Sequence, residues 1–299
     1  MSFSNSSFLK PLSRRGFLTA GVVAAAGLAV YSGEIERHWI EVTHNDVAIR
    51  GLPGAFDGVR LVQLSDIHMD EYSEPFFLRQ AVDQINRLNP DAVLLTGDFV
   101  SDLPRSRHFA GGAAWQCASI LKDLHCPQLY AVLGNHDISV GARNITAALT
   151  ANGIAVLRNA YHPIERFGER VGGRIWLAGI DDPYRGKPDP ERAIPASIRH
   201  IPNEPVILMC HAPDYVDELL AIPSGQSADL ILSGHTHGGQ VRMPGIGPLA
   251  LPPMGKKYVQ GWFRFGDTQL YVNRGLGTVG VPFRLDCPPE ITVLTLRRA

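Results

Sequence analysis

The strongest constraint on the fold is a series of short apolar segments that alternate with amphipathic ones. The first apolar segment is 61–64, and it is followed by 75–88, in which apolar residues recur at helical spacing. Residues 113–124 and 145–149 give two further helical patterns. This alternation predicts an α/β fold. The other segments that predict strands are 91–95, 129–133, 175–178, 206–209 and 230–232.

The last third of the chain changes character. Residues 258–265 and 268–273 lie on either side of Gly266-Asp267, a pair typical of a tight turn, and they predict a β-hairpin. Residues 291–296 predict a final strand. With 45% hydrophobic and 19% charged residues, the composition excludes a disordered chain and allows one large core. We therefore expect a single domain over residues 34–299.

The amino terminus has the composition of an export signal. Ser13-Arg14-Arg15-Gly16-Phe17-Leu18 precedes a run without charged residues that lasts until Glu34, and this resembles a twin-arginine signal. We therefore expect residues 1–33 to be a signal or membrane anchor, and the twin-arginine export machinery to be a partner. The protein would then lie in the periplasm, in the cell wall or anchored to the membrane. Cleavage of the segment stays open, and the alternative is a buried amino-terminal helix of a cytosolic protein.

Residues that bind metals or move protons directly follow five of the apolar segments. The carboxyl ends of strands in an open α/β sheet line one crevice, so we expect these residues to converge. Asp66 and His68 are two residues apart, and on an extended chain both side chains project to the same side, as do those of His235 and His237. The five groups are Asp66-Ile67-His68, Gly97-Asp98, Gly134-Asn135-His136-Asp137, His211 and Gly234-His235-Thr236-His237.

The candidate ligands suit a pair of metal ions. Two aspartates, one asparagine and four histidines offer oxygen and nitrogen donors, which fit Zn, Mn or Fe and differ from a thiolate site. Seven ligands exceed what one tetrahedral ion needs. Two ions about 3.5 to 4 Å apart, bridged by a carboxylate, would use all of them and hold a hydroxide for attack at phosphorus. The residues are Asp66, His68, Asp98, Asn135, His211, His235 and His237.

In this order the motifs resemble the signature of the calcineurin-like metallophosphoesterases. The resemblance implies a two-sheet β-sandwich flanked by helices, with a dinuclear metal site at the carboxyl ends of the strands. It implies that Asp98 bridges the ions, and that His136, with Asp137 behind it to orient its ring, stabilises the phosphoryl oxygens or protonates the leaving group. By the same resemblance, one ion belongs to Asp66, His68, Asp98 and His237, and the other to Asp98, Asn135, His211 and His235.

Further segments resemble a bacterial branch of envelope-targeted phosphoesterases with twin-arginine or membrane-anchoring amino termini. These segments are 179–183, 234–240, 273–277 and 288–291. The implied function is a metal-dependent phosphoester hydrolase, either a phosphatase or a phosphodiesterase. One alternative is a pyrophosphohydrolase of the UDP-2,3-diacylglucosamine type in lipid A synthesis, to which the branch is related. Another is a non-catalytic metal-binding module.

Several other features bear on ligands. Arg274, Arg242 and Arg284 are candidates for contacts to a substrate phosphate, with a solvated basic loop as the alternative for such residues. The glycines of 275–280 match a dinucleotide-binding string, but the prolines that follow leave no helix to receive a pyrophosphate. A formal net charge of −1 provides no broad basic surface, so we expect no specific nucleic-acid binding.

The cysteines and the hairpin aromatics have structural interpretations. A disulfide between Cys117 and Cys126 stays open for an exported protein. Cys210 is expected to point into the core, away from the metals, because side chains alternate along a strand. Phe263 and Phe265, with Trp262, either pack in the core beside the hairpin, which we favour, or line an apolar groove for a lipid.

Overall fold

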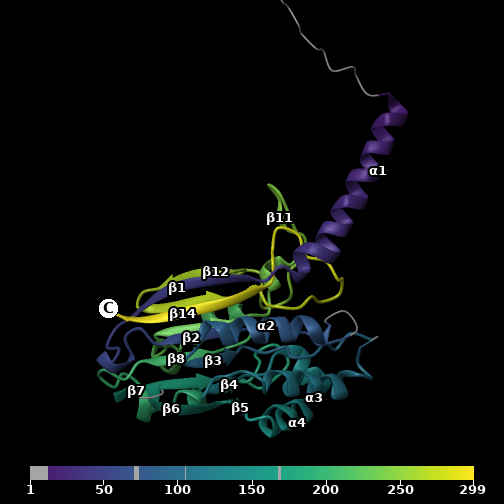
Figure 1. Ribbon diagram of the computed structural model, residues 1–299. Helices are drawn as coiled ribbons and strands as arrows, with labels where there is room; N and C mark the ends of the chain where they lie inside the picture. The colour runs from purple at the N-terminus through teal and green to yellow at the C-terminus, as the bar shows by residue number, and fades with distance from the viewer. Residues whose placement is uncertain (1–12, 71–73, 105, 168–169) are drawn as a thin grey trace, which may run out of the picture.

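Two six-stranded sheets pack face to face in the computed structural model, which describes residues 13–70, 74–104, 106–167 and 170–299 (Figure 1). Helices cover the outer face of each sheet. This is the two-sheet α/β sandwich that the resemblance implied.

The first sheet has the strand order β1-β14-β2-β3-β4-β5. Strands β2 to β5 are parallel, β14 runs antiparallel to β2, and β1 is parallel to β14. The strands are β1 (Glu41–Ile49), β2 (Arg60–Leu64), β3 (Ala92–Leu95), β4 (Leu129–Ala131), β5 (Ala155–Val156) and β14 (Glu290–Arg298). The helices on its outer face are α2 (Pro75–Leu88), α3 (Ala110–Leu121) and α4 (Asn135–Ala151).

The second sheet has the order β12-β13-β9-β8-β7-β6. Its inner strands are parallel, and an antiparallel strand closes each edge. The strands are β6 (Ala160–Phe167), β7 (Arg170–Gly179), β8 (Val206–Met209), β9 (Leu230–Ser233), β12 (Gly261–Phe265) and β13 (Thr268–Val272). Short helices lie outside it: α5 (Pro190–Ala193), α6 (Val216–Leu219) and α7 (Pro223–Gln226). A small separate hairpin consists of β10 (Arg242–Met243) and β11 (Gly247–Pro248).

Alternate residues of the parallel strands serve different layers of the core. In β3, Ala92 and Leu94 point between the two sheets, whereas Val93 and Leu95 face the helices. Both faces are therefore buried, which explains why these strands are continuous apolar runs in the sequence. The predicted hairpin is confirmed as β12 and β13, and Phe263 packs against the core outside the second sheet.

Helix α2 illustrates how the sequence determines its helices. Pro75 is its first residue, where the missing N–H costs nothing, and Phe77, Ala81 and Ile85 form one buried face at helical spacing. The helix ends because Asn89 adopts a left-handed backbone with φ 47°.

Some predicted boundaries were inaccurate, and some strands were missed. Helix α3 covers Ala110–Leu121 rather than 113–124. Strand β1 was not anticipated, because an edge strand with half-exposed polar residues has little apolar signal. Cys210 lies in the outer core of the second sheet, as predicted, and all four cysteines are free.

Helix α1 (Arg14–Val30) projects away from the sandwich (Figure 1). It begins at Ser13, whose hydroxyl accepts a hydrogen bond from the backbone N–H of Gly16. None of its residues is buried, which argues against the alternative of a buried amino-terminal helix. Residues 14–38 are long and apolar enough to cross a membrane, a test that signal sequences near the amino terminus also pass. Residues 1–12 of the predicted signal lie outside the described residues.

Candidate metal centre

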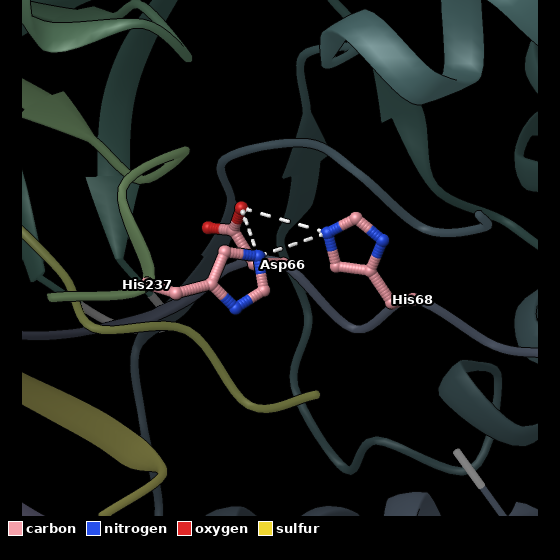
Figure 2. Close-up of side chains that lie close together, drawn as sticks. All are labelled: Asp66, His68 and His237. Atoms are coloured by element: carbon pink, nitrogen blue, oxygen red, sulfur yellow. Dashed lines mark hydrogen bonds and ion pairs between the residues drawn. The ribbon is translucent and has the colours of Figure 1, made fainter. Parts of the chain in front are cut away.

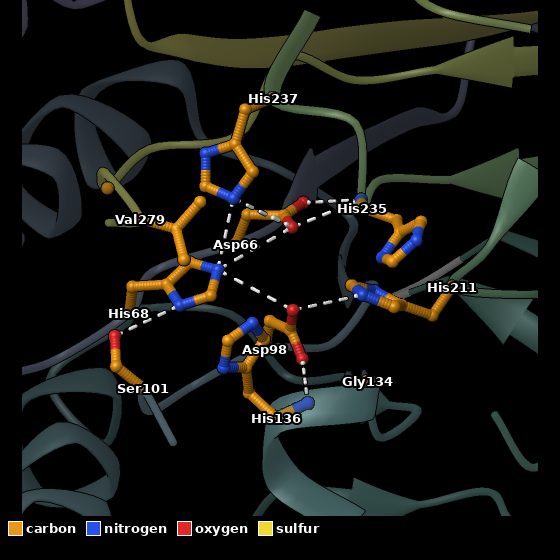
Figure 3. A network of polar contacts seen from close by, with 12 residues as sticks. Asp66, His68, Asp98, Ser101, Gly134, His136, His211, His235, His237 and Val279 are labelled. Atoms are coloured by element: carbon orange, nitrogen blue, oxygen red, sulfur yellow. Dashed lines mark hydrogen bonds and ion pairs between the residues drawn. The ribbon is translucent and has the colours of Figure 1, made fainter. Parts of the chain in front are cut away.

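The seven predicted ligands follow strands whose carboxyl ends meet at one edge of the sandwich. The side chains of six of them, all except Asn135, converge in one network to which both sheets contribute (Figure 3). All seven are buried. They are Asp66 and His68 after β2, Asp98 after β3, Asn135 after β4, His211 after β8, and His235 and His237 after β9.

The first group of ligands is Asp66, His68 and His237 (Figure 2). Nε2 of His237 lies 3.0 Å from Nε2 of His68 and 3.4 Å from Oδ1 of Asp66. Nε2 of His68 lies 3.9 Å from the same carboxylate oxygen. Two imidazole nitrogens and one carboxylate oxygen therefore face a single point.

The second group is Asp98, His211 and His235. Nε2 of His211 lies 3.2 Å from Oδ2 of Asp98, and that same oxygen lies 3.5 Å from Nε2 of His68. The carboxylate of Asp98 therefore stands between the two groups. Oδ1 of Asp98 accepts a hydrogen bond from the backbone N–H of His136 at 2.9 Å, which fixes the orientation of the carboxylate.

Backbone carbonyls select which imidazole nitrogen stays free in two of the histidines. Nδ1 of His211 donates to the carbonyl of Thr96, and Nε2 of His235 donates to the carbonyl of Pro253, each at 2.7 Å. Because a carbonyl only accepts, the other nitrogen of each ring retains a lone pair for a ligand.

The ligand segments have an unusual backbone. Five of the seven ligands have positive φ, a conformation that costs non-glycine residues about 1–3 kcal/mol each. The prediction that extended backbone would align the paired side chains was therefore wrong. Asp66 and His68 do reach the same group, but His235 and His237 belong to different groups. The five φ values are 51° at Asp66, 50° at His68, 55° at Asp98, 72° at His235 and 51° at His237.

Glycines precede the ligands because the segments approach one another closely. A Cβ at Gly134 would overlap the carboxylate of Asp98, and one at Gly234 would overlap Ser65 and the carboxylate of Asp66. Gly134 meets the end of a neighbouring strand in its own sheet, and Gly234 meets the end of a strand in the other sheet. The glycines of the sequence motifs are therefore required by space.

The charge states suit a cation site. Burial opposes ionisation of Asp98, but the charges of His211 and His136 hold its pKa well below the ordinary value. Burial and the charge of His211 lower the pKa of His235 to about 4. At neutral pH the carboxylate is therefore anionic, and the imidazole is neutral with a lone pair to share.

The donor atoms of the site are suited to two metal ions. Oδ1 of Asn135 is buried without a hydrogen-bond partner among the described residues, and it has an oxygen lone pair to offer. The two groups of nitrogen and oxygen donors lie on either side of Asp98. Such donors are typical of divalent Mn, Fe or Zn.

Residues 59–239 match the model of the calcineurin-like phosphoesterase family. The chain belongs to this family. It is a metallophosphoesterase, a hydrolase of phosphoesters, as the sequence motifs predicted.

Three relatives span almost the whole of this metallophosphoesterase. Metallophosphoesterase YkuE of Bacillus subtilis is 34% identical over 298 residues, which are 97% of this chain and 99% of the relative. Phosphodiesterase YaeI of Escherichia coli is 31% identical over 95% of this chain and 99% of its own length. UDP-2,3-diacylglucosamine pyrophosphatase LpxG of Chlamydia trachomatis is 25% identical over 93% of this chain and 95% of its own length.

His136 lies beside the metal ligands, but the carboxylate that contacts its ring is Asp102. Nδ1 of His136 is 2.9 Å from Oδ1 of Asp102, whereas the sequence interpretation gave this role to Asp137. Burial opposes protonation, but the charge of Asp98 and the contact with Asp102 raise the pKa of His136 to about 9. The sequence contains no spacing rule that links positions 102 and 136.

The carboxylate of Asp137 serves the backbone of the metallophosphoesterase. It accepts hydrogen bonds from the backbone N–H groups of Asp98 at 2.8 Å, Phe99 at 2.9 Å and Gly134 at 2.9 Å. Asp137 is in the first turn of α4, so it caps this helix and ties it to the segment that carries Asp98. Asp137 therefore positions Asp98.

A cavity of about 930 Å³ opens over the ligands. Asp98, Asn135, His136, His235 and His237 lie at its polar end. Tyr184 and Arg185 line the same end, and the guanidinium of Arg185 stacks on the ring of Tyr184, with 4.6 Å from Cζ to the ring centroid. Arg185 was not predicted as a site residue, although it lies only two residues after the motif at 179–183.

The three arginines that were predicted to contact substrate have other partners. Arg274 forms ion pairs with Glu41 at 2.7 Å and with Glu290 at 3.1 Å, and Arg242 donates to the carbonyl of Gly238 at 2.8 Å. Neither is among the described residues that line the cavity. Arg284 is buried and donates to carbonyls of the glycine loop, including Gly277. That loop packs against Asp66, so Arg284 supports the site from behind.

Proposed function

We propose that the protein hydrolyses a phosphomonoester or phosphodiester with two metal ions. The observation that supports this most is the place of Oδ2 of Asp98, 3.2 Å from His211 and 3.5 Å from His68. A single anionic oxygen shared between two groups of histidine and carboxylate side chains suits a bridging ligand. One ion would be held by Asp66, His68, Asp98 and His237, and the other by Asp98, Asn135, His211 and His235.

The ions supply, when bound, Lewis-acid activation of the phosphoryl group and of a water molecule. The chain's own residues do the rest. His136, held by Asp102, presents the other side of its imidazole to the cavity and donates a hydrogen bond or a proton to the phosphoryl or leaving-group oxygen. Arg185 at the cavity wall binds the charge of the substrate.

Hydrolysis of two chromogenic esters tests this proposal. The full chain, stripped of metal and reloaded with Mn, Zn or Fe, is assayed with p-nitrophenyl phosphate and bis-p-nitrophenyl phosphate, and its metal content is measured. We expect two ions per chain and turnover that depends on them. Absence of bound metal under all three conditions contradicts the proposal. The preferred ester distinguishes a phosphatase from a phosphodiesterase.

The variant His136→Ala distinguishes the proposed hydrolase from the alternative, a non-catalytic metal-binding module. A module needs only the ligands, whereas a hydrolase needs the imidazole as well. We expect this variant to keep both ions and to lose about 100-fold or more in kcat. Equal behaviour of the variant and the wild type in both assays favours the module.

For location, the proposal is export by the twin-arginine route, with residues 1–33 as a signal or anchor and the domain at 34–299. Helix α1 supports this proposal, because it begins with Arg14 and Arg15 and continues as an exposed, apolar helix. Replacing both arginines by lysine keeps the charge and should leave the protein in the cytoplasm, whereas Arg79→Lys should not. Export of the double-lysine variant at the wild-type level contradicts this route.

A pyrophosphohydrolase of a nucleotide-linked lipid is the second candidate. The relative LpxG, named for that activity, and the size of the cavity favour it. A nucleotide substrate would require the site to face the cytoplasm. Release of UMP from UDP-2,3-diacylglucosamine at a rate far above that of bis-p-nitrophenyl phosphate would decide for this candidate.

A further inference from the structure

The cavity over the metal ligands has two chemically different ends. The polar end contains four of the candidate ligands, together with His136 and Arg185. The remaining wall is mostly apolar and comes from segments far apart in the sequence: 249–253, 279–285, the β10–β11 hairpin and α1. A volume of about 930 Å³ lies near the upper end of the range for small-molecule sites, about 300–1,000 Å³. A phosphate group alone would fill little of this space.

The mouth of the cavity is bordered by exposed apolar side chains that also line it, which we call the apolar rim: Met243, Leu249, Val281 and Phe283. Their exposed fractions are 36%, 59%, 49% and 37%. Single exposed apolar residues are normal, but a group of them around one opening marks a surface that contacts lipid, ligand or protein. The rim therefore extends the apolar wall outward to the surface.

The apolar rim lies next to α1, which belongs to a segment long and apolar enough to cross a membrane. Leu28 and Ala29 of α1 line the cavity together with Val281 and Phe283. Just after the helix, the carbonyl of Ser32 accepts a hydrogen bond from the backbone N–H of Arg284 at 3.0 Å. The carboxyl end of α1 is thus bound to the rim, and Figure 1 shows the rest of the helix leading away from the β11 hairpin and the sandwich. With α1 in a bilayer, the rim lies at the bilayer surface.

The two ends of the cavity together define one kind of occupant. The phosphoester must reach the polar end, where the donors lie. The apolar wall then surrounds whatever is attached to the phosphate, and it leads toward α1, which is long and apolar enough to cross a membrane. A molecule with a phosphoester at one end and a hydrocarbon chain at the other matches both ends.

We propose that the substrate is an amphiphilic phosphoester carried in a membrane, with an acyl or alkyl chain in the apolar cavity while its phosphate lies at the metal centre. This inference rests on the proposed function, which names only a phosphoester. The inference gives the apolar rim and the cavity-facing residues of α1 the role of binding the acyl or alkyl chain of the substrate. Burial of each methylene group would raise affinity by at most about fourfold.

A series of alkyl p-nitrophenyl phosphates tests the inference. The full chain is placed in phosphatidylcholine nanodiscs, reloaded with Mn and assayed with the methyl, butyl and octyl esters, and with bis-p-nitrophenyl phosphate as a reference. We expect kcat/KM to rise at least tenfold from methyl to octyl. Binding of methylphosphonate and octylphosphonate is measured in parallel, and we expect the octyl compound to bind at least tenfold more tightly.

A double variant tests whether the rim is responsible. Leu249→Asn with Val281→Asn places two amides in the apolar wall, and we expect it to reduce the octyl-to-methyl ratio at least fivefold in both measurements. The matched control is Phe109→Asn, which changes an apolar side chain that is 66% exposed and does not line the cavity. It should leave the ratio unchanged.

The outcomes separate this inference from the proposed function. In one outcome the reference ester is hydrolysed normally, but the methyl, butyl and octyl esters have equal kcat/KM and the two phosphonates bind equally. This outcome contradicts an amphiphilic substrate and leaves the proposed hydrolase activity intact. Absence of hydrolysis of every ester, with tighter binding of octylphosphonate that the double variant abolishes, overturns the proposed reaction and supports the chain-binding cavity. An octyl preference that is the same in the double variant overturns the assignment of the rim.

Discussion

Nδ1 of His136 lies 2.9 Å from Oδ1 of Asp102, which comes from the segment after β3. Asp137, which follows His136 in the sequence, uses its carboxylate to accept hydrogen bonds from backbone N–H groups. Two acidic residues near one histidine therefore have separate roles. Asp102 positions the imidazole and stabilises its charge, and Asp137 holds the segment that presents Asp98.

Asp102→Asn should reduce kcat about 10- to 100-fold, because the amide no longer stabilises the charged imidazole or fixes its orientation. The metal ligands are untouched, so two ions should still bind. Steady-state kinetics and metal analysis of the same preparation measure both effects. Asp123→Asn, at an exposed aspartate just after the end of α3, is the control. A wild-type kcat in Asp102→Asn contradicts this role.

Asp137→Asn should instead reduce the free energy of unfolding, by about 3 kcal/mol. An asparagine has one acceptor oxygen, whereas the carboxylate accepts from four backbone N–H groups, and the NH2 group of the asparagine would face N–H groups that also donate. Urea unfolding of metal-free protein measures the loss. If Asp137 acted mainly on the ring of His136, this variant would be as stable as the wild type and would lose turnover only.

Arg185→Ala should raise KM for bis-p-nitrophenyl phosphate about tenfold or more, since a charged hydrogen bond to the substrate is worth about 1.5–3 kcal/mol. Arg242→Ala is the matched control, because Arg242 donates to a backbone carbonyl and is not among the described residues lining the cavity. The prediction concerns KM, and circular dichroism checks that both variants are folded. A larger KM effect in the control would reverse the assignment.

Stability should fall in acid through Glu290. Burial raises the pKa of Glu290, but the charge of Arg274 and the hydroxyl of Tyr271 outweigh burial and lower it below the ordinary 4.5. A lowered pKa in the folded state means that the stabilisation is complete above pH 4.5 and is lost as the pH falls below it. Urea unfolding of the wild type and Glu290→Gln between pH 7 and pH 3.5 measures this. The variant should be less stable at pH 7 and show a weaker dependence on pH.

The strand-end rule was enough to predict that Asp66, Asp98 and His211 lie close together, because the carboxyl ends of parallel strands meet at one edge. It did not provide their local conformation. The left-handed backbones at Asp66 and His68 result from the crowding of segments that are distant in sequence, such as Gly234 against Asp66. Sequence spacing carries no information on such contacts.

The same limit applies to residues that act on the ligands from outside the motifs. Asp102 is four residues beyond Asp98, and only the turn of the loop brings it to His136. Arg274 looked free in the sequence, but Glu41 lies on β1, an edge strand with no apolar pattern to reveal it. The apolar rim could not be predicted because its members come from segments that meet only in the folded protein.

The most direct test of the account is the metal content of Asp98→Asn, measured by elemental analysis of the Mn-reloaded full chain beside the wild type. We predict two ions per wild-type chain and the loss of at least one ion in the variant, with most of its hydrolysis of bis-p-nitrophenyl phosphate. A neutral amide could not offset the charge of two cations as a bridging carboxylate would. Two tightly bound ions and an undiminished rate in Asp98→Asn would contradict the account.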